Sequence, residues 1–494
     1  MAKKNKELNF DEVIFDEAAK DKDLEHLELP LSRRIFWGVG IAAILLMLIS
    51  LGRIFYINVT RGEFYMQRAG INANKEIVIP APRGIITDRF GEPLVGNASV
   101  LSVFVDVGAL FKEYNRDKIV GVAKELAEIL SLDQSDIEQM LSEVNLERNN
   151  FVLVRRDVSV AEGIAIRSLN SPFVKLINDY ARLYIDGPIF SHIVGYTGFA
   201  DSGNEIVGKA GLEDYYDWRL SGREGSSILY RDTYGNILED RIVNEPVAGE
   251  QLVTAIDADL QRYFYNSLKL GLRRLGRDAG VGIAINPQSG EILALVSMPS
   301  YDNNLLISRG NDDVKKAILN SSRQPLFNRA IAGTYSPGST IKPLVALAAL
   351  KDGVIDPAHQ IFSAGFIEIP NLYFPNQPSR FLDWKAHGWV DLRSALARSS
   401  NIYFYAVGGG LDDIKGLGIE KLKYYWQYFG FGKIMGVDMA NESSGYLPDP
   451  QKKENNSSDI WRIGDTYNIS IGQGDLSVSP LQLISFIASI ANGG

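Results

Sequence analysis

The chain has 494 residues, of which 46% are apolar and 22% are charged, and its formal net charge is −9. This length exceeds what one hydrophobic core usually serves, so we expect two or three folded units. The acidic balance, with basic residues dispersed among acids, argues against nucleic acid as a partner. Because the chain contains no cysteine, disulfides, thiolate catalysis and thiolate metal sites are excluded.

The N-terminal end combines a polar tail with an apolar segment. Residues 1–32 are rich in Asp, Glu and Lys and have no sustained apolar period, so we expect a largely disordered tail. Ile35–Gly52 is uncharged, and Ile54–Ile57 extends the apolar run beyond Arg53. About 18 to 20 apolar residues suffice to span the hydrocarbon core of a bilayer. We therefore predict a single transmembrane helix over residues 33–57.

The basic residues around this segment predict its orientation. Arg33 and Arg34 directly precede the apolar run, and further lysines lie near the N-terminus. The positive-inside rule places the N-terminus in the cytoplasm and the chain after residue 57 outside it, although Arg53 and Arg61 weaken the bias. A cleavable signal peptide is the alternative. We favour an uncleaved anchor, because the run is longer than the apolar region of a usual signal peptide and no clear small-x-small cleavage site is present.

Residues 58–277 mix strand-like and helical patterns. Residues 76–79 and 100–107 are typical of strands, whereas residues 116–130 carry apolar side chains at helical spacing. We predict an α+β domain here. Asp257 and Asp259 resemble paired carboxylates for acid–base work, but they precede a helical stretch whose N-terminus favours acidic side chains, so we interpret them as caps.

The last part of the chain begins with two short strand patterns and then places a serine three residues before a lysine. Ser339 and Lys342 stand in Tyr335–Pro343, ahead of an apolar run. Residues at i and i+3 share a helix face, so the amine can reach the hydroxyl, while the free N–H groups of the helix start polarise the same oxygen. Pro337 and Gly338 mark the turn into this helix, which we expect to begin near Ser339. The pattern alone decides nothing, since about one or two occur by chance in such a chain.

A second polar pattern follows further along the chain. Ser399 and Asn401 stand two residues apart, ahead of an aromatic run that ends at Tyr405. In isolation they are more typical of a helix N-cap or a polar turn. Together with Ser339 and Lys342, we interpret them as a second motif of one active site.

These two motifs resemble those of the penicillin-binding protein transpeptidases, specifically the monofunctional class B group and its cell-elongation branch. The similarity covers nearly the whole chain after the tail. Further segments that resemble the family in its non-catalytic domain are Ala81–Gly91, Gly211–Glu213 and Gly222–Gly225. Those that resemble its catalytic domain are the opening hairpin Ile285–Ser297 and, before the family's third motif, Ile471–Gly474 and Ser479–Gln482.

The resemblance implies an α+β architecture with one membrane anchor. Its parts would be a cytoplasmic tail (1–32), a transmembrane anchor (33–57), an elongated non-catalytic pedestal, or dimerisation-like, domain (58–277) and a transpeptidase domain with helices on an antiparallel sheet (278–494). The protein would be a single-pass protein of the bacterial cytoplasmic membrane with an extracytoplasmic catalytic domain. Its implied partners are a membrane glycan polymerase of the elongation complex and scaffold proteins, and no cofactor is implied.

The resemblance also assigns roles to the motif residues. Ser339 would attack the penultimate D-Ala carbonyl of a peptidoglycan stem peptide and form an acyl-enzyme, with Lys342 as its base. Ser399 would relay a proton to the leaving amine, and Asn401 would hold the substrate's amide. β-Lactams would acylate the same serine, because their strained amide mimics the D-Ala-D-Ala end. Since an ordinary lysine is protonated at neutral pH, Lys342 has to lose its proton through partial burial and neighbouring positive charge.

The family's third motif, Lys-Thr-Gly or Lys-Ser-Gly, does not occur in the 494 residues. The resemblance makes its lysine one source of positive charge near Lys342, and its strand one donor of the oxyanion hole. The chain stops at Gly493–Gly494, which is a natural turn. We therefore expect a C-terminally incomplete transpeptidase domain, truncated from a longer protein. A catalytically incomplete membrane scaffold is the alternative of a different class, and a division-specific class B transpeptidase is the nearest alternative enzyme.

One further pair has the spacing of metal ligands. Asp383 and His387 stand at i and i+4, and some members of the family bind zinc near this position with a cysteine ligand. Because this chain has no cysteine, we expect no metal and interpret the pair as part of a structural loop, with Asp383 and His387 as weak metal candidates only.

Overall fold

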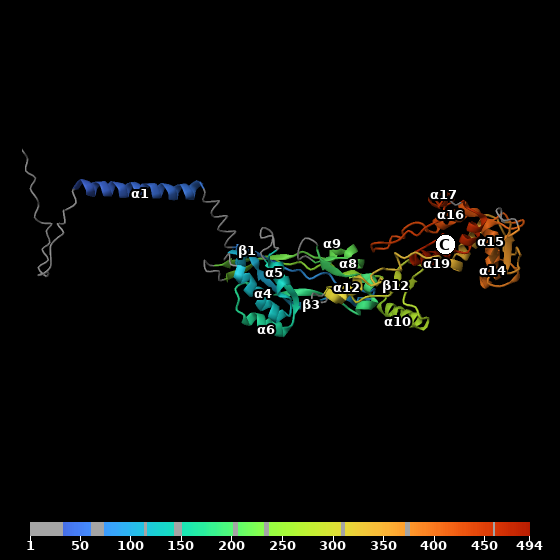
Figure 1. Ribbon diagram of the computed structural model, residues 1–494, viewed down its shortest axis with the longest axis horizontal. Helices are drawn as coiled ribbons and strands as arrows, with labels where there is room; N and C mark the ends of the chain where they lie inside the picture. Colours follow the sequence, from blue (N-terminus) through green and yellow to red (C-terminus); the bar gives the residue numbers. More distant parts are fainter. Residues whose placement is uncertain are drawn as a thin grey trace, which may run out of the picture. The chain divides into compact units, whose positions relative to one another are not determined.

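The computed structural model describes most of the chain after the polar tail (Figure 1). The described residues are 33–60, 74–112, 116–142, 151–200, 206–231, 237–307, 312–370, 376–457 and 460–494. They fall into two compact units, one made of residues 1–77 with 228–241 and the other of residues 78–227 with 242–494. The disorder predicted for residues 1–32 concerns a segment outside the described residues.

The first unit contains the long helix α1 (Arg33–Thr60). Within it, Trp37–Tyr56 has a mean hydropathy of 2.2 and none of it is buried against the rest of the chain, so this stretch is long and apolar enough to cross a membrane. Apolar side chains on every face suit a helix that is surrounded by lipid. The apolar helix predicted over residues 33–57 is confirmed, and it continues to Thr60. A three-stranded sheet has the order β1-β8-β9 and consists of β1 (Asn74–Ile79), β8 (Gly225–Arg231) and β9 (Ile237–Asn244).

A five-stranded sheet forms the centre of the region before residue 278. Its strands are β2 (Ile86–Thr87), β3 (Pro93–Asp106), β4 (Phe151–Val158), β5 (Val174–Tyr184) and β10 (Leu252–Val253). The long strand β3 pairs antiparallel with both β4 and β5. The helices that follow or separate these strands are α3 (Val107–Lys112), α4 (Arg116–Leu130), α5 (Gln134–Ser142) and α6 (Val160–Ser168). The predicted helix over residues 116–130 is confirmed as α4, and the strand predicted over residues 100–107 lies in β3, which ends at Asp106.

Short elements connect this sheet with the last part of the chain. They are the 3₁₀ turn η2 (Gly187–Ile189), α7 (Ser191–Val194), β6 (Thr197–Phe199), β7 (Ile206–Gly208), α8 (Gly211–Tyr215), α9 (Asp217–Leu220) and α10 (Ala258–Arg274). The fully buried Glu213 of α8 accepts from the guanidinium groups of Arg83, at 2.9 Å, and of Arg182, at 2.6 Å. Two of the segments that resemble the family are therefore held together by a buried ion pair. Asp257 accepts the N–H of Leu260 and is the N-cap of α10, as predicted.

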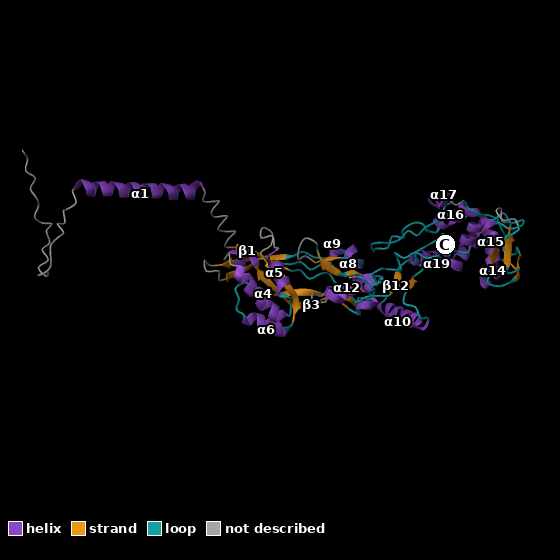
Figure 2. Cartoon of the chain, viewed as in Figure 1, coloured by secondary structure: helices purple, strands orange, loops and turns teal. Residues whose placement is uncertain are grey.

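The last part of the chain starts with the hairpin that the resemblance implied and continues mainly as helices (Figure 2). The antiparallel strands β11 (Gly280–Ile285) and β12 (Ile292–Met298) form the hairpin, and α10 packs on both strands. The helices are α11 (Asn303–Ile307), α12 (Asp312–Leu319), α13 (Lys342–Lys351), α14 (Leu392–Arg398), α15 (Asn401–Gly409), α16 (Gly418–Tyr428), α17 (Pro450–Ser457), α18 (Ile463–Ser470) and α19 (Pro480–Ala491). Two small antiparallel sheets pair β13 (Ile361–Ser363) with β16 (Gly388–Val390) and β14 (Phe366–Ile369) with β15 (Ser379–Leu382).

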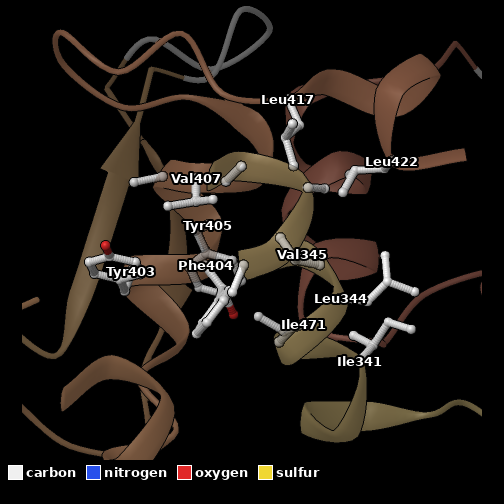
Figure 3. Packing of buried hydrophobic residues seen from close by; sticks show 14 of the residues in the cluster. Ile341, Leu344, Val345, Tyr403, Phe404, Tyr405, Val407, Leu417, Leu422 and Ile471 are labelled. Carbon is white, nitrogen blue, oxygen red and sulfur yellow. The ribbon is translucent and has the colours of Figure 1, made fainter. Parts of the chain in front are cut away.

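The core of this domain forms where α13 and α15 meet. Helix α15 is apolar on all sides and buried along nearly its whole length, which suits a helix that other elements surround. It packs against α13, α16 and α18. Figure 3 shows Leu344 and Val345 of α13 in the same cluster as Phe404 and Val407 of α15. The serine-lysine motif and the Ser399–Asn401 motif therefore begin two helices that share one core.

The turn that carries Ser339 is fixed by a close approach of two backbones. The predicted α-helix start near Ser339 is corrected in detail, because Gly338–Ile341 forms the 3₁₀ turn η3 and the α-helix starts at Lys342. The N–H of Gly338 donates to the carbonyl of Gly472 at 2.8 Å. A Cβ on Gly472 would lie 2.2 Å from the Gly338 carbonyl oxygen, and its φ of +76° also favours glycine. Gly472 is thus required for the position of the turn.

We expect Gly472→Ala to destabilise the domain more than the matched variant Gly353→Ala. Gly353 also has a positive φ, of +65°, but a Cβ there meets nothing within 4 Å. Both variants carry a conformational cost of about 1–2 kcal/mol, whereas overpacking adds about 1–3 kcal/mol for Gly472→Ala alone. Urea unfolding of both variants in the same detergent, followed by tryptophan fluorescence, measures the difference. Equal destabilisation would contradict the assigned role of Gly472.

Candidate active site

The Lys342 amine lies at the centre of the candidate site. Its side chain is only 1% exposed. The Nζ atom donates to the carbonyl oxygen of Ser399 at 2.9 Å, to the Ser399 hydroxyl at 3.1 Å and to Oδ1 of Asn401 at 2.8 Å. An ammonium group has three donor hydrogens, so these three acceptors satisfy it completely. The structure therefore brings together three of the four residues predicted for the site.

The electrostatics of this amine combine two opposing effects. Burial disfavours the charged form and lowers the pKa of Lys342 to about 8, while the negative charge of Asp383 acts in the opposite direction. The amine also lies 5.5 Å from the centre of the Phe404 ring, whose face attracts a cation. A lysine with this pKa is partly neutral near neutral pH and can accept a proton there.

Ser339 lies one residue inside η3 and is exposed to solvent. Its carbonyl accepts the N–H of Lys342, so the turn leads directly into α13. Within the described residues, the hydrogen bonds of the Lys342 amine go to Ser399 and Asn401, and none goes to the Ser339 hydroxyl. The predicted direct contact between the two side chains is thus replaced by contacts across to the second motif. Catalytic hydrogen bonds are often completed only when substrate is bound.

The second motif is a sharp junction between two helices. Ser399 ends α14 in the left-handed conformation, with φ of 53°, and Ser400 caps α15 by accepting the N–H of Tyr403. The helix N-cap in this motif is therefore Ser400. The side chains of Ser399 and Asn401, on either side of it, both accept from the Lys342 amine. The left-handed backbone at Ser399 lets its carbonyl and its hydroxyl accept from the same amine.

Sequence reasoning missed the role of Asp383 in this junction. The residue lies in the loop between β15 and β16, and its side chain is fully buried. Its Oδ2 atom accepts from the hydroxyl of Ser400 at 2.8 Å and from the backbone N–H groups of Asn401 and Ile402 at 2.9 and 3.1 Å. Burial raises the pKa of this carboxyl, but the hydrogen bonds outweigh burial and hold it below its ordinary value. The sequence shows only an acidic residue in a loop before the second motif, and no pattern in it indicates these contacts.

The residues around Asp383 do not fit a zinc site. Nε2 of His387 lies 3.6 Å from Oδ1 of Asp383, and both ring nitrogens of His387 are buried without a hydrogen-bond partner. Zinc in proteins needs at least three protein ligands. Among the described residues, no group of three or more His, Cys, Asp or Glu side chains could hold a metal. The absence of a metal stays a prediction, and we assign no catalytic step to one.

Comparison with known proteins identifies the family. Residues 280–494 match the family model described as penicillin binding protein transpeptidase domain, and residues 78–254 match the penicillin-binding protein dimerisation domain. Over 491 residues the chain is 31% identical to peptidoglycan D,D-transpeptidase MrdA of Acinetobacter baumannii, which covers 96% of this chain and 69% of the relative.

Solved structures agree with this result. PBP2 of Helicobacter pylori, solved in complex with MreC, has a TM-score of 0.71 and 27% identity over 85% of this chain and 78% of that one. A chain from a study of how a peptidoglycan synthase complex coordinates polymerization and crosslinking has a TM-score of 0.62 and 27% identity over 94% of this chain and 78% of that one. The chain therefore belongs to the class B penicillin-binding proteins, in the branch of the serine-type D,D-transpeptidases that includes MrdA and PBP2.

Proposed function

We propose that this chain cross-links peptidoglycan stem peptides during cell-wall elongation and that Ser339 is its nucleophile. The observation that carries the proposal is the buried Lys342 amine, which holds Ser399 and Asn401 next to the turn of an exposed serine. Such an arrangement supplies a nucleophile, a base and polar groups for the leaving amine and the substrate. The whole-chain similarity to D,D-transpeptidases supports this reaction class.

The reaction proceeds in two acyl-transfer steps. Ser339 Oγ attacks the carbonyl carbon of the penultimate D-Ala while neutral Lys342 takes the hydroxyl proton. The tetrahedral intermediate collapses, the terminal D-Ala leaves, and Ser399 relays the proton held by Lys342 to its amine. The amine of a neighbouring stem peptide then attacks the ester carbonyl and gives up a proton to Lys342, which returns it to Ser339 Oγ as the ester bond breaks and the cross-link forms. Asn401 holds the amide of the substrate, and a β-lactam acylates Ser339 in place of the stem peptide.

Lys342 changes partners during this sequence. As an ammonium it satisfies all three acceptors of the second motif, so it has no lone pair for Ser339. After it loses a proton, one of the three contacts is released and the lone pair can turn toward the hydroxyl. Burial makes this loss possible near neutral pH, because it lowers the pKa of Lys342 to about 8.

The remaining parts of the chain support a location of this site in the cell envelope. We assign residues 1–32 to a cytoplasmic tail, 33–57 to the membrane anchor, 58–277 to the pedestal and 278–494 to the transpeptidase domain. The arginines before α1 support a cytoplasmic N-terminus. The partners are a membrane glycan polymerase and a scaffold protein of the MreC kind, since similar proteins were solved with MreC and in a peptidoglycan synthase complex.

We expect Ser339→Ala to abolish covalent labelling by a fluorescent penicillin, because no other residue then carries the acyl group. Ser336 is also exposed and lies in the same segment, so Ser336→Ala is the matched control and retains labelling. In-gel fluorescence of the purified full chain in detergent gives the result. Unchanged labelling of Ser339→Ala would remove Ser339 from the mechanism.

The acylation rate should rise with pH and level off above about 8. Lys342 acts as base only when neutral, so the rate falls about tenfold for each pH unit below its pKa. Stopped-flow acylation between pH 6 and 10 measures this profile. Lys351→Arg, at the exposed end of the same helix, leaves the profile unchanged, whereas Lys342→Arg removes activity. A rate that stays constant from pH 6 to 9 would exclude Lys342 as the base.

Ser399 should show a trade-off between stability and activity. Its φ of 53° is unfavourable for any residue with a Cβ. Ser399→Gly and Ser399→Ala both lose the hydroxyl and both should acylate slowly, but only the glycine variant also loses the backbone strain. We expect Ser399→Gly to unfold with a free energy about 1 kcal/mol higher than that of Ser399→Ala. Equal stabilities in urea would show that Ser399 is unstrained.

A further inference from the structure

The carboxylate of Asp383 is the most densely hydrogen-bonded acid near the active site. Its Oδ2 accepts from Ser363 Oγ at 3.3 Å in addition to the donors of Ser400, Asn401 and Ile402. Its Oδ1 accepts the N–H of Trp384 at 2.9 Å. With a side chain that is fully shielded from water, these bonds take the place of hydration.

These donors belong mainly to the first turn of α15. Two of them are backbone N–H groups that have no acceptor inside the helix, and a third is the hydroxyl of the N-cap Ser400. A negative charge at this end also interacts favourably with the helix dipole. Asp383 therefore fixes where α15 begins, although it lies in a different loop.

The first turn of α15 is also the part of the helix that holds Lys342. Asn401 donates its backbone N–H to Asp383 and accepts from the Lys342 amine through its side chain. One residue thus connects the buried carboxylate with the buried amine. The charges of Asp383 and Lys342 are linked by this short path and by direct attraction.

We propose that Asp383 is a positioning residue of the transpeptidase reaction, which clamps the start of α15 so that Ser399 and Asn401 face Lys342. Its negative charge also favours the ammonium form of Lys342, against the larger effect of burial. This inference rests on the proposed function of Ser339 and Lys342. It requires no metal, since Oδ2 already has four donors and only Oδ1 faces His387.

Other titratable groups on the loop of Asp383 and on the two helices of the second motif do not replace it. The surrounding elements carry His387 in the same loop, Arg398 at the end of α14 and Tyr405 on α15. Arg398 donates to the carbonyl of His387, and the Tyr405 hydroxyl donates to the carbonyl of Leu382. Burial has the larger effect on the pKa of Lys342 and lowers it. Asp383 is the charged group that raises this pKa.

The test compares two changes at Asp383 with a matched change in another capping acid. Asp383→Asn keeps an oxygen for the Oδ2 donors but loses the charge, and Asp383→Ala loses both. Asp391 caps α14 by accepting from the backbone and hydroxyl of Ser394, so Asp391→Asn is the control. All variants are made in the full chain and purified in the same detergent.

The first readout is the pH profile of acylation by a fluorescent penicillin. We expect Asp383→Ala to acylate about 100-fold more slowly, as a loss of active-site positioning does. On the high-pH plateau Asp383→Asn retains more of the rate than Asp383→Ala, because it keeps an oxygen for the Oδ2 donors. The midpoint of its profile moves to lower pH, because the amine loses a nearby negative charge. Asp391→Asn leaves both quantities unchanged. An Asp383→Asn profile with the wild-type midpoint, or an Asp383→Ala rate equal to that of the control, would overturn the proposal.

The second readout follows Lys342 without any reaction. In the chain labelled with ¹³C at lysine Cε, the signal that disappears in Lys342→Arg belongs to this residue, and its titration should move to lower pH in Asp383→Asn. Failure of the proposed function gives a different pattern, in which the wild type is not acylated while this titration still shifts. If a chelator reproduces the Asp383→Asn effects in the wild type, the carboxylate acts through a metal and the clamp is wrong.

Discussion

The site depends on the cost of burying the Lys342 amine. A cation that is removed from water without partners is unfavourable by several kcal/mol, and this side chain is 1% exposed. The chain offsets the cost with three acceptors that come from Ser399 and Asn401 alone. The two motifs therefore depend on each other, because the Lys342 amine of the first motif needs the acceptors of the second motif to be buried.

This requirement explains the shape of the second motif. Two acceptors on Ser399 can point to one amine because the backbone is left-handed there, and α15 starts two residues later, so Asn401 lies on the same side. Only Ser399 and Ser400 separate α14 from α15, so the two helices are not joined by a long loop. Its order comes from the packing of α15 in the core below and from the Asp383 carboxylate beside it. Tertiary contacts of this kind hold an active site more firmly than a surface loop does.

The sequence allowed the individual elements to be predicted better than their contacts. The apolar helix, α4 and the two strand patterns before Ser339 follow from local periodicity. Residue patterns singled out the two motifs of the site, whereas the resemblance to the family supplied the hairpin and the roles of the site residues. What could not be predicted was that Lys342 bonds to Ser399 and Asn401 and not to Ser339, because helical spacing describes a single helix and says nothing of a partner far along the chain. Asp383 was assigned to a structural loop for the same reason. Its loop position is correct, but the four donors on its Oδ2 come from separate segments that only the fold brings together.

The backbone contact between Gly338 and Gly472 has a mechanical consequence. The two residues lie in different elements, one in the turn of the nucleophile and the other just after α18. In addition to the single hydrogen bond between these glycines, a pair of backbone hydrogen bonds between Tyr335 and Val478, each 2.9 Å, joins the same two segments. A displacement of the strip from 472 to 478 either breaks these bonds or carries the serine with it. The position of the Ser339 hydroxyl is thereby coupled to residues 472–478, which lie outside both motifs.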